Sequence, residues 1–395
     1  IIGNNVIQIK SYAFYKCTKL SYVQIGGSVK AMDSNGTVNS ILPSPKYDDS
    51  TDAQLLVLEG KAEIDPIVID NTTWSFAGKH PDNDENLYVY LTPENHKAKL
   101  GEIGCLVIYK SEDKTFVIRY TGYLEIKDSD GNTATTGYTY DIDNNILQIN
   151  TEGTYTIVPM VEGEISERIV INKTVNITLD NVNINTSTGA ALEVQGNNAE
   201  NASDNITATI KLKGENTLTP TGRNYAGLQL SNGANLILEN GAAESETVGS
   251  LTVTGGEHGA GIGSGCYGTA GNITISGGTV TATGGKYAAG IGSGYGMVAS
   301  NLNITYKSTA GNILISGGKV TIKAGDYAAG IGSGWWGIIG NITISGGEIN
   351  VETSNADSYG NGAGIGAGRV GLAGNIEITD GTIKATGNNY GVGIG

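Results

Sequence analysis

One short phrase, Gly-Ile-Gly, recurs through the second half of this chain and constrains its fold more than any other feature. The copies are centred on five isoleucines, Ile262, Ile291, Ile331, Ile365 and Ile394. Successive isoleucines are 29 to 40 residues apart, so the phrase is fixed while the spacing varies. A fixed phrase with a loose period is typical of a repeat protein whose insertions lie in loops.

Each repeat also carries two runs in which apolar and polar residues alternate. Ile273 and Ile275 form one such run, and Val280 and Ala282 form the next. This period of two is that of a half-buried strand. A coil of three short strands cannot bury its own isoleucines, so coils must stack, with each strand parallel to its copy ~4.8 Å away. We therefore predict an all-β fold, a right-handed parallel β-helix.

Glycine and asparagine recur at fixed places in these repeats. Glycine makes up 60 of the 395 residues, against a usual share of ~7%, and it suits tight corners with positive φ. An asparagine stands just before the run of Ile273 and Ile275 and just before the equivalent run in three other repeats, at Asn272, Asn312, Asn341 and Asn375. We predict that these side chains form a hydrogen-bonded ladder along the axis.

The chain divides by pattern into four segments. They are a leucine-rich-repeat remnant (1–32), a linker (33–50), a small antiparallel β module (51–135) and the parallel β-helix (136–395). The first segment resembles a bacterial surface leucine-rich repeat in its Ala13-Phe14 pair, its Cys17 and a Leu20/Val23/Ile25 strand. The last repeat stops partway, so we expect the natural protein to continue beyond it.

The composition excludes several classes of partner. The net charge of −15 opposes binding to nucleic acid and to anionic membrane surfaces, and no apolar run approaches the ~18 residues of a membrane span. Three widely separated cysteines do not form a disulfide scaffold, and the three histidines lack zinc-type spacing. We expect a monomeric bacterial protein that is secreted or displayed on the cell surface.

Aromatic residues flank the Gly-Ile-Gly phrase on both sides. Four places before the isoleucine stand His258, Tyr287, Tyr327, Asn361 and Tyr390, and just after the phrase stand Tyr267, Tyr295, Trp335, Trp336 and Arg369. Stacked coils would turn these positions into rows of rings suited to sugar faces. Two adjacent indoles in a Gly-rich turn cannot both enter the core, so we expect at least one to be exposed. The alternative is that the rings only stiffen the stack.

Catalysis has less support in the sequence. The acids of the regular repeats are scattered, and only Glu257 and Asp326 share a position, immediately before the first ring row. Two coils apart, they would be separated by about 9.6 Å along the axis, near the upper limit of ~9.5 Å for an inverting glycosidase. We keep a glycoside hydrolase or polysaccharide lyase as a second alternative, behind a structural adhesin or stalk.

Residues 150 to 395 also resemble a known family. The stretches 177–184, 210–218, 236–241 and 249–256 are similar to those of secreted parallel β-helix carbohydrate-binding proteins of clostridia and gut bacteria. The resemblance implies binding of a polysaccharide or a host or plant glycan, implies that calcium can be a cofactor, and implies no established catalysis. Its motifs are repeat signatures, so they transfer no individual binding residue.

Overall fold

The protein has two compact units. The computed structural model describes residues 123–132, 134, 136–141, 144–159, 163–198, 205–299, 304–353 and 360–395, and before them the backbone of strands β1 to β8. The first unit comprises residues 1–123 and 140–143, and the second comprises residues 124–139 and 144–395. No helix in the described segments is long and apolar enough to cross a membrane.

The described strands of the first unit form a mixed sheet and a separate hairpin. The sheet order is β1-β3-β6-β5-β4-β2, with β1 parallel to β3 and the β3-β6-β5-β4 pairs antiparallel. The strands are β1 (Tyr22–Gly26), β2 (Thr37–Val38), β3 (Leu55–Glu59), β4 (Ile67–Ile69), β5 (Thr72–Lys79) and β6 (Leu87–Pro93), and the hairpin is β7 (Gly104–Lys110) with β8 (Thr115–Thr121). The rest of the predicted leucine-rich repeat and linker lies outside the described residues.

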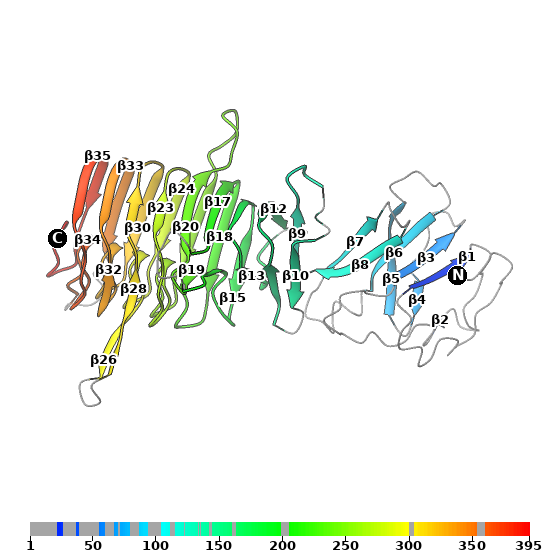
Figure 1. Cartoon of the computed structure of the whole chain (residues 1–395), viewed down its shortest axis with the longest axis horizontal. Coiled ribbons are helices and arrows are strands. Elements are labelled where there is room, and N and C mark those ends of the chain that lie inside the picture. Colours follow the sequence, from blue (N-terminus) through cyan, green and yellow to red (C-terminus); the bar gives the residue numbers. More distant parts are fainter. Residues whose placement is uncertain are drawn as a thin grey trace. The chain divides into compact units, whose positions relative to one another are not determined.

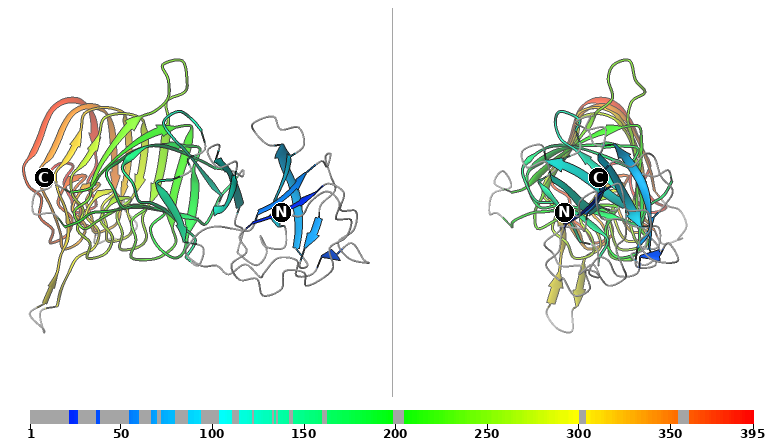
Figure 2. Two further views of the ribbon diagram at one scale, coloured as in Figure 1. Left: turned by 45° about the vertical axis from the view of Figure 1, so that its right-hand side comes forward. Right: turned by 90° about the vertical axis from the view of Figure 1, so that its right-hand side faces the viewer.

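The second unit is a stack of three-sided coils, as predicted from the repeats (Figure 1). Face A holds the Gly-Ile-Gly strands and their earlier equivalents, face B holds the strands that follow the asparagine ladder, and face C holds the strands that come next. Within each face a strand is hydrogen-bonded in parallel to its copy in the next coil. Figure 2 shows the same stack from two further sides.

The strands of the three faces differ in length. Face A contains β11 (Ile146–Ile149), β13 (Arg168–Ile171), β16 (Leu192–Gln195), β19 (Leu228–Ser231), β22 (Ile262–Gly263), β25 (Ile291–Gly292), β31 (Ile331–Gly332) and β34 (Ile365–Gly366), next to β10 (Tyr138–Asp141). Face B contains β12 (Gly153–Pro159), β14 (Val175–Asp180), β17 (Thr207–Lys213), β20 (Asn235–Asn240), β23 (Ile273–Ile275) and β29 (Ile313–Ile315). Face C contains β15 (Asn183–Thr186), β18 (Glu215–Pro220), β21 (Ser250–Thr254), β24 (Thr279–Thr283) and β30 (Lys319–Ala324).

Two long strands, an inserted hairpin and a further pair of short parallel strands complete the unit. β33 (Ile342–Thr353) and β35 (Ile376–Ala385) each run through face B and face C, which joins the two faces into one sheet. A hairpin of β26 (Met297–Ala299) and β27 (Ile304–Tyr306) projects from the stack (Figure 1). After it, β28 (Ser308–Ala310) pairs in parallel with β32 (Gly337–Ile339).

Apolar columns fill the interior of the stack. On face A, Ile262, Ile291 and Ile331 occupy one register, and each is 0% exposed. On face B, Ile273 and Ile313 pair in the same way, with exposures of 0% and 1%. Burying one such side chain contributes ~1.5–3 kcal/mol, and it does so only because the coils above and below complete its surroundings.

The asparagine ladder is confirmed and begins one coil earlier than predicted. In each step an Asn side-chain oxygen accepts a hydrogen bond from the backbone N–H of the equivalent Asn in the next coil. The steps are Asn235 to Asn272 (2.8 Å), Asn272 to Asn312 (2.9 Å), Asn312 to Asn341 (2.8 Å) and Asn341 to Asn375 (2.9 Å). The ladder therefore satisfies backbone donors at a corner where no strand partner exists.

The start of the stack is closed by an antiparallel strand. β9 (Leu124–Lys127) pairs antiparallel with β12, so these residues belong to the second unit, although the sequence placed them in the small module. The turn after β9 is an Asp-Gly turn, in which the Asp128 carboxylate accepts hydrogen bonds from the backbone N–H groups of Asp130 and Asn132, and Gly131 has φ +83°. The other segment boundaries stay predictions.

Candidate functional site

The Gly-Ile-Gly phrase forms a tight loop whose isoleucine side chain is buried in the core. In the second copy, the N–H of Ala289 donates to the carbonyl oxygen of Ser293 at 3.1 Å, which closes a loop around Ile291. Gly292 has φ +136°, and a Cβ there would lie 1.9 Å from the carbonyl oxygen of Gly332 in the next coil. Only glycine fits this position, which explains why the phrase does not vary.

Three buried serines hold the far side of this loop. Ser264, Ser293 and Ser333 are each 0% exposed. Their hydroxyl oxygens accept hydrogen bonds from backbone N–H groups of the next coil, from Gly294 (3.1 Å), Gly334 (3.0 Å) and Gly368 (3.0 Å). These three glycines directly precede Tyr295, Trp335 and Arg369, which are flanking positions found in the sequence. The serine hydrogen bonds therefore fix the backbone from which each of these side chains extends.

Backbone hydrogen bonds join the two flanking positions across coils. The N–H of the residue after the phrase donates to the carbonyl oxygen of the residue before the phrase in the preceding coil. The pairs are Tyr295 with His258 (2.9 Å), Trp335 with Tyr287 (2.9 Å) and Arg369 with Tyr327 (2.8 Å). The two rows predicted from the sequence are therefore one double row along the same corner.

The side chains of this double row form one continuous aromatic surface, which we call the ring cluster. It comprises His258, Tyr267, Tyr287, Tyr295, Tyr306, Tyr327 and Trp335, whose neighbouring ring centroids lie 5.0 to 5.9 Å apart. Tyr287 and Tyr295 each contact four other rings of the cluster, and Trp335 contacts three tyrosine rings. Tyr267 and Tyr306 are the most exposed members, at 41% and 44%, and the others are half-buried.

Two cations lie against the rings. The guanidinium carbon of Arg369 is 5.3 Å from the centroid of Trp335 and 5.5 Å from that of Tyr327, and the ammonium of Lys286 is 5.6 Å from that of Tyr287. Neither cation forms a salt bridge within the described part of the chain. The ring cluster thus combines flat apolar faces with hydrogen-bond donors, in a chain whose net charge is negative.

The titratable groups beside the cluster do not favour covalent chemistry. Burial, with a small opposing hydrogen bond from Tyr267, raises the pKa of the Cys266 thiol to about 11, so this thiol is protonated at neutral pH. Burial lowers the pKa of His258, against the attraction of nearby Glu257 and with the repulsion of Arg223. Burial also raises the pKa of the phenols of Tyr267 and Tyr295. These groups are neutral at pH 7.

The structure brings together, with His258, five of the seven tyrosines and tryptophans of the two predicted rows. They are Tyr267, Tyr287, Tyr295, Tyr327 and Trp335. Trp336 and Tyr390 make no ring contact with other described residues. Trp336 has φ +58°, and Tyr390 is 73% exposed. Both indoles of the tryptophan pair are partly exposed. Sequence reasoning missed Tyr306, because it enters from the inserted hairpin, where the repeat register is lost.

The predicted acid pair lies in two different environments. Glu257 is engaged by Arg223, whose Nε is 2.7 Å from the carboxylate. Asp326 is buried, with 7% of its surface exposed. No group of three His, Cys, Asp or Glu side chains suited to a metal ion is present among the described residues. The pair gives no support to an acid and base acting across one substrate.

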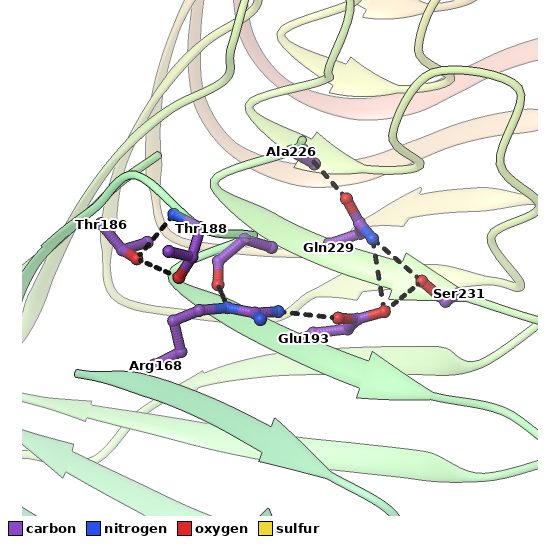
Figure 3. A network of polar contacts seen from close by, with 8 residues as sticks. Arg168, Thr186, Thr188, Glu193, Ala226, Gln229 and Ser231 are labelled. Atoms are coloured by element: carbon purple, nitrogen blue, oxygen red, sulfur yellow. Dashed lines mark hydrogen bonds and ion pairs between the residues drawn. The ribbon is translucent and has the colours of Figure 1, made fainter. Parts of the chain in front are cut away.

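A separate network of polar side chains lies on the earlier coils of face A (Figure 3). The Arg168 guanidinium donates to the carbonyl oxygen of Ala190 (2.8 Å) and pairs with Glu193 (3.1 Å). Glu193 also accepts bonds from Gln229 (3.3 Å) and Ser231 (2.8 Å). Each coil supplies a partner to its neighbour, so this network satisfies its own charges and ties three coils together.

Comparison with known families identifies the repeat. The model of the family described as Beta helix repeat matches residues 273–295, 313–335, 342–369 and 376–395. These matches lie within the second unit and support its parallel β-helix fold. Each of the first three matches starts at a face B strand and ends at a flanking position, at Tyr295, Trp335 and Arg369. The β-helix repeat therefore includes the corner that carries the ring cluster. No curated protein and no solved structure matches the chain significantly.

Proposed function

We propose that this β-helix is an extracellular bacterial protein that binds a polysaccharide at the ring cluster. The observation that supports this most is the continuous aromatic surface of the ring cluster, which is flanked by Arg369 and Lys286, two cations that form no salt bridge within the described residues. A structural stack of rings needs neither the cations nor the exposed faces of Tyr267 and Tyr306. A sugar would use both, because its faces stack on exposed rings and its hydroxyls accept hydrogen bonds from the cations.

The geometry suits an extended chain better than a single sugar. Each coil contributes flanking positions to the double row, and coils repeat every ~4.8 Å along the axis. A polysaccharide lying along the corner would meet successive rings with successive units. The net charge of −15 disfavours nucleic acid as the ligand.

The test is a binding screen over neutral and acidic polysaccharides with three proteins. They are the unaltered chain, Trp335→Ala, and Trp336→Ala as the matched control. We expect Trp335→Ala to weaken binding by about tenfold or more, which corresponds to ~1.4 kcal/mol, and Trp336→Ala to leave it unchanged. Thermal unfolding of each variant separates a lost contact from a lost fold. Equal binding by all three proteins would contradict the proposed site.

A structural stalk or adhesin is the second candidate, and it is favoured by the stacking of the rings on one another. Tyr287 and Tyr327 stack at 5.6 Å with an interplanar angle of 18°, as expected of a ladder that stabilises the stack. In that case no polysaccharide binds, and Trp335→Ala changes only stability. A hydrolase or lyase has the least support, because Glu257 is held by Arg223 and Asp326 is buried.

A further inference from the structure

A polar cavity lies at the corner between face A and face B in the first coils of the stack. Its volume is about 380 Å³, which is within the usual range of roughly 300–1,000 Å³ for small-molecule sites. Its described lining comes from three successive coils, with Glu152 on the first, Lys173 on the second, and Gln195 and Asn205 on the third. None of the described lining residues is aromatic, so the cavity differs in chemistry from the ring cluster.

A longer connection in the third coil forms one wall of the cavity. The first two coils cross from face A to face B through residues 150–152 and 172–174, whereas the third uses residues 196–206. Asn205 joins the two ends of this connection, because its Oδ1 accepts hydrogen bonds from the N–H groups of Asn197 (2.9 Å) and Ile206 (2.8 Å). Its Nδ2 donates to the carbonyl oxygen of Asn232 in the next coil (2.9 Å). Asn205 is only 6% exposed, so this wall is held in place from within the stack.

Two opposite charges on neighbouring coils line this cavity without pairing. The side chains of Glu152 and Lys173 are exposed, and neither forms a hydrogen bond or an ion pair with another described residue. Elsewhere in the stack, opposite charges on neighbouring coils do pair. The pairs are Asp180 with Lys213 (3.5 Å), Glu193 with Arg168 (3.1 Å), Glu257 with Arg223 (2.7 Å) and Glu348 with Lys319 (3.2 Å). At this corner a carboxylate and an ammonium are instead both available to a ligand.

The charges select a ligand that carries both signs. A carboxylate only accepts hydrogen bonds and an ammonium only donates them, so the ligand must present a donor to Glu152 and an acceptor to Lys173. These bonds are stronger when the ligand groups are themselves charged. The amide of Gln195 also lines the cavity and offers one further donor and acceptor. A neutral sugar would balance neither charge and would find no ring here for its faces.

We propose that this cavity binds a small zwitterion of the free amino acid class. The ammonium of the amino acid pairs with Glu152, its carboxylate pairs with Lys173, and Gln195 bonds to either group from the third coil. Because both protein charges are exposed to water, each pair contributes little and we expect weak binding in the millimolar range. The cavity is at a different corner from the ring cluster, so this binding does not depend on the proposed polysaccharide binding.

Ligand-observed NMR titration tests the site with defined probes. The standard L-amino acids are titrated one by one into the unaltered chain, and the strongest binder is then compared with its N-acetyl and its carboxamide derivatives. The N-acetyl form lacks the positive charge and the carboxamide lacks the negative charge. We expect at least one free amino acid to bind, and each derivative to bind about fivefold more weakly, as expected for the loss of one exposed charge pair.

Charge variants place the binding in the cavity. Glu152→Gln and Lys173→Gln should each weaken binding of the same amino acid by about fivefold, and Lys173→Glu should abolish it, because attraction becomes repulsion. Glu348→Gln and Lys319→Gln are the matched controls, since they remove the same charges from face C, and they should bind like the unaltered chain. Thermal unfolding of each variant without ligand checks that the fold is retained.

Three results would each overturn the proposal. The first is that no amino acid binds the unaltered chain. The second is that the free amino acid and its two derivatives bind equally well, since the charges would then play no part. The third is that the Glu152 and Lys173 variants bind as well as the face C controls, which would place the binding elsewhere.

Discussion

The backbone N–H of Trp335 donates to the carbonyl oxygen of Tyr287 in the preceding coil at 2.9 Å, and the centroids of their rings lie 5.3 Å apart. The same backbone bond recurs between Tyr295 and His258, whose rings lie 5.0 Å apart. In both pairs, the backbone hydrogen bond between neighbouring coils places the two side chains close enough for their rings to be in contact. Four predictions follow from this and from the other ladders of the stack.

The pairing of Tyr287 with Trp335 should appear as a coupling energy. In a double-mutant cycle with Tyr287→Ala and Trp335→Ala, we expect the unfolding free energies to be non-additive by about 0.5–1.5 kcal/mol, as for other aromatic pairs. The matched cycle of Tyr287→Ala with Trp336→Ala should be additive, because Trp336 makes no ring contact in the described structure. Denaturant unfolding measures both. Coupling of equal size in the two cycles would contradict the assigned geometry.

One step of the asparagine ladder should be measurable by itself. Asn272→Ala removes the acceptor for the N–H of Asn312, so we expect a loss of about 1 kcal/mol in unfolding free energy. Asn272→Asp retains an acceptor and should restore most of that loss. Asn375→Ala should cost little, because the side chain of Asn375 accepts no bond from a later coil in the described structure. A similar loss for Asn272→Ala and Asn375→Ala would mean that the ladder does not stabilise the fold.

The second glycine of the phrase should tolerate no side chain. Gly292→Ala places a Cβ against the carbonyl of Gly332 at a φ that L residues rarely adopt, so we expect a loss above about 4 kcal/mol or failure to fold. Gly131→Ala is the control, since Gly131 also has positive φ but nothing lies within 4 Å of the added Cβ. It should cost only about 1–2 kcal/mol. Soluble yield and thermal unfolding measure both, and equal effects would contradict the proposed close approach.

A buried carboxyl should make the stability of the stack depend on pH. Glu167 is 0% exposed, and burial raises its pKa well above the ordinary value despite an opposing hydrogen bond from the backbone of Leu124. The folded state therefore favours the protonated acid, and stability is lost as pH rises from the ordinary pKa of glutamate toward the raised one. Glu167→Gln should remove this dependence and be the more stable protein at neutral pH. Parallel pH profiles for the two proteins would refute the assignment.

The coil architecture could be predicted from the sequence because it rests on local periodicity. The alternation at Ile273 and Ile275 identifies a strand, and the recurrence of Gly-Ile-Gly requires stacking, so the parallel faces and the asparagine ladder were expected. Most members of the ring cluster were found for the same reason, since stacking converts a shared repeat position into a row. The merging of the two flanking rows into one cluster depends on hydrogen bonds between coils, and the spacing of the repeats does not reveal these bonds.

The sequence by itself determined the repeat, the three faces and which positions recur along the axis, because each of these follows from the spacing of apolar residues and glycines along the chain. The tertiary structure alone decided that the two flanking rows form one cluster, that Trp335 lies within it while Trp336 does not, and that Tyr306 joins from an insertion. It also decided that Asn388 reaches Asp326 across a coil. The physical reason is that the turn after the phrase sets adjacent residues in different directions, and only contacts between coils show which side chains meet.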